Sequence, residues 1–393
     1  MIQASHVTYL DRATRSAVKA GLRYLIDTVP GIRRKRNGKS FAYFSPSGQR
    51  IRAVRTIARI RALAVPPAWK KVWISPYSNS HLQATGRDAR GRKQYRYHAD
   101  WSETRDADKY ERLVKFARAL PRIRRHVTRD LSRHTLSREK VLATVVRLLE
   151  ATLIRVGNDE YARDNNSFGL TTMRNRHVAV TGSQIRFSFR GKSGKDRQID
   201  LHSSRLAKIV KRCHDLSGQE LFQYVDENGS VHDVTSGDVN EYLRTVSGED
   251  ITAKDFRTWA GTVLAAQALK EFETFDSQAR AKRNATRAIE SVAKRLGNTE
   301  AVCRKCYVHP AILESYLDRT LVETLKRRTE GELRGALAKL RPEEAAVLAL
   351  LQQRMKRKLA MRCHEGALPR TLHAVEPHSR QHAFRRTKSI REI

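Results

Sequence analysis

The stretch LGNTEAVCRKCYVHP, residues 296–310, connects two segments that have the apolar spacing of helices. Before it, apolar residues recur at helical intervals from Ala285 to Leu296, and Gly297 follows where a helix end favours a left-handed residue. Pro310 suits the first turn of a second helix, because its missing N–H group would have no partner there anyway. The stretch therefore predicts a helical region with a short connection that carries two cysteines, a tyrosine and a histidine.

Cys303, Cys306 and His309 have a spacing that invites comparison with a metal site. A structural zinc site takes four ligands, whereas this stretch offers three and places two cationic residues between its cysteines. A thioredoxin-like redox pair would need a βαβ context, which is absent here. We therefore interpret the cysteines as incidental small residues beside Tyr307, and expect no metal and no cofactor.

The charge of the chain indicates a polyanionic partner. Its 393 residues include 77 Lys and Arg against 41 Asp and Glu, a formal charge of +36, while 40% hydrophobic residues suffice for a core. Nucleic acid is the first candidate, because phosphate neutralisation supplies most non-specific affinity. Four scattered cysteines, no apolar signal core and no membrane-length apolar run predict that the protein meets its polyanion in the cytoplasm and does not enter membranes.

Residues 1–100 predict a small β-rich domain with frequent turns. The segments with strand character are SFAYFSPSGQRI (40–51), VWISPYSNSHLQAT (72–85) and KQYRYHA (93–99). In the first, a Ser-Pro-Ser-Gly turn should separate two strands. The segment TIARIRALAVPPAW (56–69) predicts a short helix that the paired prolines end.

From about residue 101 the helical period dominates, which makes the expected fold class α+β. One helix should run through Val141 and Leu149 and end just before Gly157, with Arg155 in its last turn. The segments QIRFSFR and DRQIDL should form a hairpin around the turn GKSGK. We expect a β-rich domain over 1–100, a mostly helical domain with a small antiparallel sheet over 101–328, and a basic helical extension over 329–393 with a disordered end.

Several common chemistries are excluded by the motifs. Neither GKS segment has the glycine that a P-loop needs five residues earlier, and no glycine-rich turn suggests a dinucleotide site. No carboxylate cluster suggests a two-metal nuclease. Phosphodiester chemistry here would therefore rely on guanidinium and ammonium groups to meet the charge of the transition state, and on a side-chain nucleophile.

Four segments in chain order carry a family resemblance. RVGNDEYARDNNSFGLTTMRNRHV (155–178), FRGKSGKDR (189–197), KDFRTWAGT (254–262) and the opening stretch together resemble the catalytic core of type IB DNA topoisomerases, in their small bacterial and poxvirus branch. LQATGRDARGRKQYRYH (82–98) resembles the DNA-clamping domain of that branch. The likeness covers about residues 20 to 325, and it is specific because the motifs occur together and in order.

The resemblance implies a reaction and its principal residues. Tyr307 would attack a backbone phosphorus of duplex DNA and form a 3′-phosphotyrosyl link, while Arg155 and Arg257 would bind the non-bridging oxygens with planar, bidentate donors. The link conserves the bond energy, so one strand could be cut and resealed, and positive and negative supercoils relaxed, without ATP or metal. We expect a monomeric isomerase of this kind.

Two further roles follow from the resemblance. Lys192 would be the general acid for the leaving 5′-oxygen, although Lys195 shares its turn and stays an alternative. Asn298 stands where poxvirus members have histidine. An amide can donate a hydrogen bond to a phosphate oxygen but carries no charge, so we expect oxygen binding and no acid–base role.

The N-terminal motif predicts the DNA contacts. Gln94, Tyr95 and Tyr97 match the major-groove contacts of the family, and on a strand both tyrosines share one face. The phosphate contacts expected around them are Arg87, Arg90, Arg92 and Lys93. An ordinary strand with two packed tyrosines is the alternative.

Two other functions stay open from the sequence. A site-specific tyrosine recombinase shares the Arg–Lys–Arg–Tyr chemistry, but Lys254 stands three residues before Arg257, where recombinases usually have histidine. Asn298 and the clamp motif also argue against it. A non-catalytic, basic DNA-binding protein is the second alternative, and in such a protein Tyr307 would have no chemical role.

Overall fold

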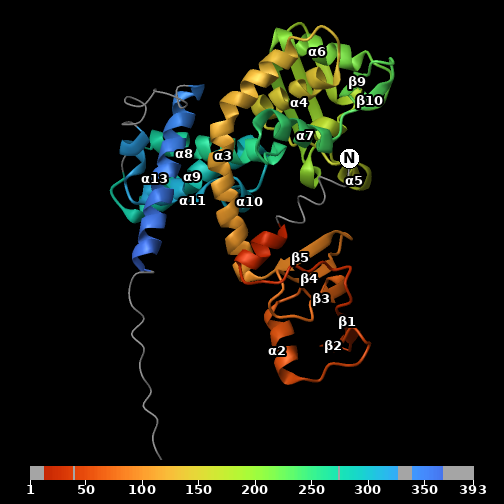
Figure 1. Ribbon diagram of the computed structural model, residues 1–393, viewed down its shortest axis with the longest axis vertical. Coiled ribbons are helices and arrows are strands. Elements are labelled where there is room, and N and C mark those ends of the chain that lie inside the picture. The colour runs from red at the N-terminus through yellow and green to blue at the C-terminus, as the bar shows by residue number, and fades with distance from the viewer. Residues whose placement is uncertain (1–12, 39, 273–274, 326–338, 366–393) are drawn as a thin grey trace, which may run out of the picture.

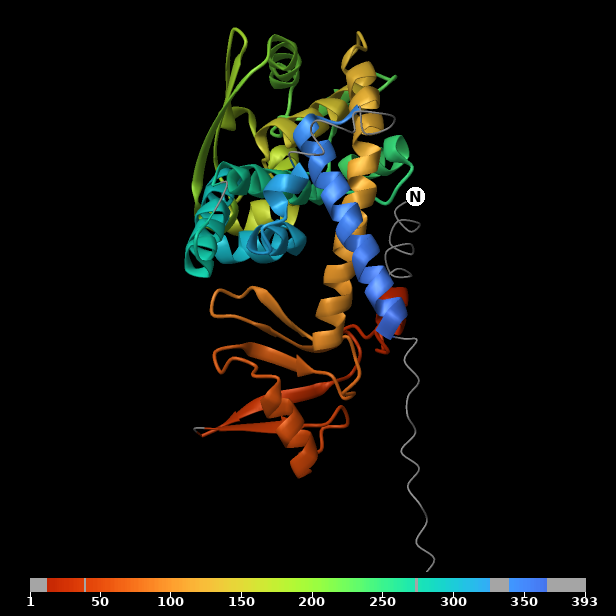
Figure 2. The same ribbon diagram turned by 90° about the vertical axis from the view of Figure 1, so that its left-hand side faces the viewer.

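The chain folds into an N-terminal sheet and a larger, mostly helical part (Figure 1). The computed structural model describes residues 13–38, 40–272, 275–325 and 339–365. Helix α3 (Ala99–Leu131) leads from the sheet into the helical part, and α13 (Pro342–Glu365) lies beside it (Figure 2). The predicted α+β class is confirmed.

The N-terminal part is an antiparallel sheet with the strand order β2-β1-β3-β4-β5. Its elements are β1 (Ile32–Asn37), β2 (Ser40–Phe44), α2 (Val54–Ala62), β3 (Lys70–Ile74), β4 (Leu82–Arg87) and β5 (Lys93–Tyr97). Ile32, Ile60 and Ile74 form the centre of its small core. The strand–turn–strand prediction for 40–51 is wrong in its second half, because β2 pairs along its length with β1 and only a single bridge joins Phe44 to Arg50.

The remaining part is mainly helical. Its helices are α4 (Arg138–Thr152), α5 (Asp159–Asn165), α6 (Ser204–His214), α7 (Ser236–Ser247), α8 (Ala253–Glu271), α9 (Gln278–Leu296), α10 (Glu300–Cys306) and α11 (Pro310–Leu317). Its strands are β6 (Val178–Thr181), β7 (Gln184–Arg190), β8 (Asp196–His202), β9 (Gln223–Val225) and β10 (Val231–Asp233). One large core joins these elements, with α8 buried along most of its length.

The predicted hairpin is confirmed as β7 and β8, with Arg190 opposite Asp196 across the turn. On β7 the residues Ile185, Phe187 and Phe189 are buried and alternate with exposed ones, as the two-residue period requires. β6 completes this three-stranded sheet. The turn between β7 and β8 places the two lysines of the GKSGK segment beside the end of α4, as the cavity lining below shows.

Helix α4 ends earlier than the sequence predicts. It stops at Thr152, and Leu153 adopts a left-handed conformation with φ of 56°. The chain then runs extended, so that the carbonyl of Arg155 accepts from the N–H of Leu170 at 2.9 Å. Arg155 therefore lies outside the helix, and the prediction that it sits in the last helical turn is wrong.

Helix α13 shows that part of the C-terminal extension belongs to the folded core. Residues Ala346–Leu351 are buried, and the helix packs on α3 and α8. The helical prediction is confirmed for Pro342–Glu365. The expected disordered end, after residue 365, lies outside the described residues.

Candidate active site

Arg257 is held in the first turns of α8. The predicted capping box opens this helix, with the N–H of Thr252 donating to Asp255 Oδ2 at 2.8 Å. Arg257 is 3% exposed. Its Nη1 donates to the carbonyl of Leu153, and its Nη2 donates to the carbonyl of Leu296 at 2.9 Å. Two backbone segments thus orient the guanidinium, while its buried Nε lacks a partner among the described residues.

Arg155 and Asn298 meet beside this guanidinium. Nη2 of Arg155 donates to Oδ1 of Asn298, which directly follows Gly297, the left-handed cap of α9 with φ of 63°. Because Oδ1 accepts from an arginine, the amide nitrogen faces elsewhere as a donor. That Nδ2 atom is buried and has no partner within the described ranges. An unpaired buried donor is costly unless a ligand satisfies it.

Tyr307 ends helix α10 and lies against α8. The centroid of its ring is 5.1 Å from Cζ of Arg257, and its carbonyl accepts from Oγ1 of Thr262 at 3.4 Å. Gly261 allows this approach, since a Cβ there would lie 2.7 Å from the Tyr307 carbonyl oxygen. The stretch 296–310 therefore places its tyrosine directly at the buried arginine.

The arginines change the acidity of the tyrosine. Burial raises the pKa of Tyr307, but the charges of Arg257, Arg155 and Lys254 outweigh it and lower the pKa below the ordinary value for tyrosine. Burial, reinforced by the charges of Arg155 and Arg197, lowers the pKa of Arg257 to about 10. The site thus favours the phenolate of the nucleophile that the sequence predicts, and would gain from a bound anion.

A cavity of about 340 Å³ joins the candidate residues. Its lining includes Arg155, Lys192, Arg257 and Tyr307, and no acidic side chain of the described residues lines it. Asn298 does not line this cavity, but it accepts a hydrogen bond from Arg155, which does. The structure therefore brings together all five residues that the sequence selected as catalytic, four of them around one cavity.

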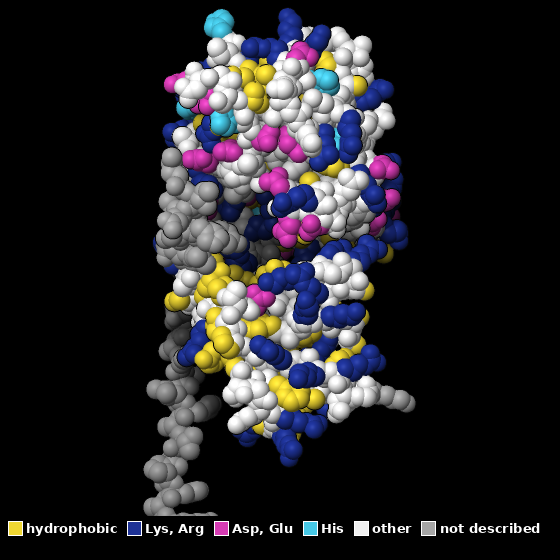
Figure 3. Space-filling model, turned by 90° about the vertical axis from the view of Figure 1, so that its right-hand side faces the viewer, with side chains coloured by type: hydrophobic (Ala, Val, Ile, Leu, Met, Phe, Trp, Pro, Cys, Tyr) yellow, Lys and Arg dark blue, Asp and Glu magenta, His cyan; other side chains and the backbone are white. Residues whose placement is uncertain are grey.

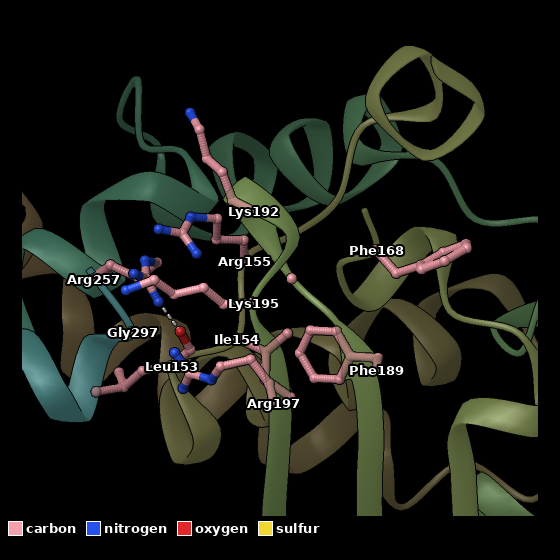
Figure 4. A pocket seen from close by; sticks show the side chains of 11 residues that line it. Leu153, Ile154, Arg155, Phe168, Phe189, Lys192, Lys195, Arg197, Arg257 and Gly297 are labelled. Carbon is pink, nitrogen blue, oxygen red and sulfur yellow. Dashed lines mark hydrogen bonds between the residues drawn. The ribbon is translucent and has the colours of Figure 1, made fainter. Parts of the chain in front are cut away.

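The two lysines of the β7–β8 turn lie differently. Nζ of Lys192 is 5.6 Å from the ring centroid of Tyr161, and Lys192 lines the same cavity as Tyr307. Lys195 lines a smaller pocket of about 20 Å³, which Lys192 lines as well and which is drawn in Figure 4. In that view Lys192 points away from the arginine cluster, and Lys195 extends between Arg155 and Arg257.

Three residues that line these cavities were not predicted as functional from the sequence. Lys254 and Tyr161 line the larger cavity, and Arg197 lines the smaller pocket. All three lie inside the quoted motifs, so motif membership was the available signal. Their side-chain directions depend on which way α8, α5 and β8 face, which the motifs alone do not specify.

The cysteines stand apart from this chemistry. Cys303 is fully buried on α10, where burial raises its pKa to about 11, and Cys306 is half-buried next to Tyr307. Neither forms a disulfide. Among the residues that the structure describes, no three His, Cys, Asp or Glu side chains gather as a metal site.

The predicted base-reading residues lie on β5, away from the cavity. Tyr95 and Tyr97 are exposed and stacked, with centroids 5.9 Å apart. Arg96 faces the other side and donates to the carbonyl of Ala64 at 3.0 Å. Nε2 of Gln94 donates to Asp88 Oδ2 at 2.9 Å, which leaves Oε1 as the outward acceptor.

The predicted phosphate contacts are partly engaged within the protein. Arg92 pairs with Asp88 at 2.7 Å and Lys93 with Asp27 at 2.7 Å. Arg87 donates to the carbonyl of Gly91 at 2.7 Å. These side chains are exposed or on the edge of the sheet, so the bonds are weak enough to exchange for phosphate.

Basic side chains are unevenly distributed over the surface. On the face shown in Figure 3, the lower part, which is the N-terminal sheet, carries many Lys and Arg side chains and few acids. The upper part on this face mixes both signs. In the described part of the chain, every helix is too short or too polar to cross a membrane.

Comparison with known proteins identifies the family. The model described as eukaryotic DNA topoisomerase I, catalytic core, matches residues 98–331, and the model of the bacterial DNA topoisomerase IB N-terminal domain matches residues 40–88. DNA topoisomerase 1B of Acanthamoeba polyphaga mimivirus is 32% identical over 295 residues, covering 73% of this chain and 88% of the relative. DNA topoisomerase 1B of vaccinia virus (strain Copenhagen) is 22% identical over 255 residues, covering 64% and 78%.

These matches first place the chain among proteins that have the catalytic core of DNA topoisomerase I. With the bacterial N-terminal match and the viral relatives added, the chain belongs to the type IB DNA topoisomerase family, and the predicted resemblance is confirmed. Membership implies duplex DNA as the substrate.

Proposed function

We propose that this protein cleaves one strand of duplex DNA through Tyr307, lets the duplex rotate about the intact strand, and reseals the cut. The observation that carries the proposal is the single cavity shared by Tyr307, two arginines and Lys192, with no acid of the described residues in its lining. Such a site attracts a phosphate and repels no part of it. The lowered pKa of Tyr307 supports its role as nucleophile.

The reaction needs two proton movements and one bond exchange. The phenol of Tyr307 loses its proton to water, its oxygen bonds to the scissile phosphorus, and the bond from phosphorus to the 5′-oxygen breaks. Lys192 donates a proton to that leaving oxygen, forming a 5′-hydroxyl. The 3′-phosphotyrosyl link conserves the energy of the diester. Resealing is the reverse, so no ATP and no metal enters the cycle.

The remaining residues stabilise charge. Arg155 and Arg257 bind the non-bridging oxygens, where their preorganised donors are worth most in the transition state. Nδ2 of Asn298 and Nε of Arg257 are buried donors that have no hydrogen-bond partner among the described residues, and a phosphate oxygen would satisfy either. Lys192 is preferred over Lys195 as general acid, because it lines the cavity of the nucleophile.

The N-terminal sheet would hold the duplex against this site. In this proposal Gln94, Tyr95 and Tyr97 contact bases in the major groove, and the neighbouring Arg and Lys side chains contact phosphates. The division into a DNA-binding part over 1–100, a catalytic part over 101–328 and an extension over 329–393 belongs to the same proposal. So do a monomeric state and a cytoplasmic, nucleoid-associated location.

Relaxation of supercoiled plasmid is the direct test. The purified protein should relax positive and negative supercoils in EDTA without ATP, and denaturing gels should show a covalent adduct with the 3′ end of the cut strand. The Tyr307→Phe variant should bind duplex DNA with unchanged affinity and form no adduct. An adduct that persists in Tyr307→Phe would mean that another residue is the nucleophile.

The same assay separates the alternatives. A tyrosine recombinase would join specific sites without relaxing ordinary plasmid. A non-catalytic DNA-binding protein would shift the duplex on native gels but give no adduct, and Tyr307→Phe would change nothing measurable. Loss of relaxation in EDTA would reopen the question of a metal.

A further inference from the structure

Arg197 occupies an unusual place for a charged side chain. On β8 it alternates with exposed residues and shares the inward face with Ile199 and Leu201, which pack against the core. A two-residue period on a sheet with one buried face reserves such positions for apolar side chains. An arginine there needs either an acidic partner or a function that uses its charge.

The guanidinium of Arg197 fits against the cap of α9. Gly297 has φ of 63°, and a Cβ built on it would fall 1.2 Å from Nη1 of Arg197. Gly191 makes similar room, since a Cβ there would lie 3.3 Å from Cγ of Arg197. The arginine thus fills the space that two glycines leave, next to the residue that carries the Asn298 amide.

No group in the described part of the chain neutralises this arginine. Its side chain makes no hydrogen bond or ion pair with any described residue, although it is only partly exposed. Burial and the charge of Arg155 both lower its pKa. It lines the pocket of about 20 Å³ together with Arg155, Lys195 and Arg257, and Figure 4 shows these cationic side chains gathered around it. Uncompensated cations in such proximity repel one another until an anion binds.

We propose that Arg197 is a further catalytic residue of strand cleavage, whose guanidinium binds the charge of the scissile phosphate beside Arg155 and Arg257. The inference rests on the proposed function and adds a third guanidinium to the phosphate site. A charged donor is useful at this position because the neighbouring donor, the amide of Asn298, is neutral. Arg155, Lys192 and Arg257 line both this pocket and the cavity of Tyr307, so a phosphodiester bound between them would bring its charge next to Arg197, which pairs with no described residue.

The test compares two variants that each remove one positive charge from the β7–β8 hairpin, and a third that keeps the charge. Arg197→Gln removes the proposed contact, and Arg197→Lys keeps a charge but loses the planar fork. Arg186→Gln is the control, because Arg186 is an exposed residue of β7 that pairs with Asp200 at 2.7 Å. Melting temperature and duplex affinity are measured for each variant, so that folding and general DNA binding are read separately from cleavage.

The substrate supplies the second comparison. The site at which wild-type protein forms its adduct in a short duplex is mapped first. Single-turnover cleavage is then measured on that duplex with its normal scissile phosphodiester, and on one with a neutral methylphosphonate at the same link. A residue that binds the phosphate charge should matter on the charged link only, whereas a residue that only supports the fold should matter equally on both.

We expect Arg197→Gln to slow cleavage of the phosphodiester by about tenfold to a hundredfold, in line with the loss of one charged hydrogen bond. On the methylphosphonate the loss should be less than about threefold, because the partner charge is gone. Arg197→Lys should recover part of the rate on the phosphodiester. Should Arg197→Gln fail to fold, the ratio of losses on the two links is read from Arg197→Lys alone.

Three outcomes would overturn the inference. If Arg197→Gln cleaves the phosphodiester as fast as Arg186→Gln, Arg197 is not part of the site. Equal losses on both links would make it a structural residue. If wild-type protein forms no adduct, the proposed function itself fails, which the first two outcomes would leave intact.

Discussion

Arginines on two sides of helix α8 differ in their partners: on one side the partners are carboxylates, and on the other no described carboxylate is in contact. On one side, Arg124 of α3 contacts Glu150 at 2.8 Å and Glu344 at 2.7 Å, and Glu344 also accepts from the indole of Trp259 on α8 at 3.4 Å. On the other side, Arg257 donates to two backbone carbonyls and Arg155 to one amide, while Arg197 has no hydrogen bond, and none of the three contacts a described carboxylate. Both groups are largely shielded from water.

The difference separates structural from functional charge. Carboxylates in direct contact raise the pKa of Arg124 despite its burial, whereas the pKa of Arg257 falls to about 10 because burial and like charges are not offset. A paired arginine has no need of a ligand, and breaking its pair costs stability. An unpaired, oriented arginine is already arranged for an anion, and its charge is worth most when that anion binds.

The largest expected effect is at the candidate site, where the arginines contact no described carboxylate. Arg257→Lys should lower the single-turnover cleavage rate by about a hundredfold to a thousandfold, because one ammonium cannot replace two preorganised donors in the transition state. Urea unfolding should show little change in stability. Arg280→Lys, at an exposed pair with Asp276, is the control and should change neither quantity. A large loss of stability with a normal cleavage rate would reverse the comparison.

The paired side should show the opposite pattern. Arg124→Met should lower the free energy of unfolding by about 3 kcal/mol, since Glu344 loses its guanidinium partner and Glu150 keeps only its longer contacts with Arg147 and Arg341. The cleavage rate of the folded variant should stay near that of the wild type.

Arg125→Met on the same helix is the matched control, because Arg125 is exposed. Urea titration monitored by tryptophan fluorescence measures each stability, and cleavage is assayed well below the transition. Equal stability of the two variants would show that the contact between α3 and α13 does not depend on this pair.

Glu344→Gln should have a smaller effect that depends on pH. Burial raises the pKa of Glu344, but the hydrogen bond and charge of Arg124 outweigh it and lower the pKa. A carboxyl with a lowered pKa in the folded state adds stability above its unfolded pKa, and this stability is lost as the pH falls. The wild type should therefore exceed Glu344→Gln in stability at neutral pH, and the gap should shrink below about pH 4.5, near the ordinary pKa of glutamate. A gap that is constant from neutral to acidic pH would exclude this ion pair as its source.

The sequence predicted the outline of the site because its motifs carry side-chain chemistry. Gly297 and Pro310 marked the ends of α9 and the start of α11, and so placed Tyr307 in the connection between them. The capping box at Thr252 located Arg257 near the start of α8. These signals depend only on neighbouring residues in the chain, so they can be recognised without knowing how the helices pack.

The sequence could not predict what orients the arginines. Arg257 is held by the carbonyls of Leu153 and Leu296, and any residue type offers the same carbonyl. The left-handed turn at Leu153 breaks α4 early, although leucine favours helix and gives no sign of a stop. The inward direction of Arg197 was implicit in the alternation of DRQIDL, but its contact with Gly297 depends on how β8 packs against α9.

The smallest expected effect concerns Lys254, which lines the cavity of Tyr307 together with Arg155 and Arg257. Lys254 is exposed, and its charge is the weakest of the three that lower the pKa of Tyr307. A cation favours the phenolate, so Lys254→Gln should raise the pKa of Tyr307 and move the cleavage–pH profile to higher pH. At a pH above the Tyr307 titration of both the wild type and Lys254→Gln, the two cleavage rates should be equal, because the nucleophile is then fully ionised in both proteins.

The profile distinguishes an effect on acidity from an effect on phosphate binding. Lys254→Arg should keep the wild-type profile, since it retains the charge. A lower plateau without a shift in Lys254→Gln would mean that Lys254 contacts DNA instead of acting on Tyr307. High salt should reduce the shift, because the charge of an exposed lysine is screened, while the buried arginines keep most of their influence on the phenol.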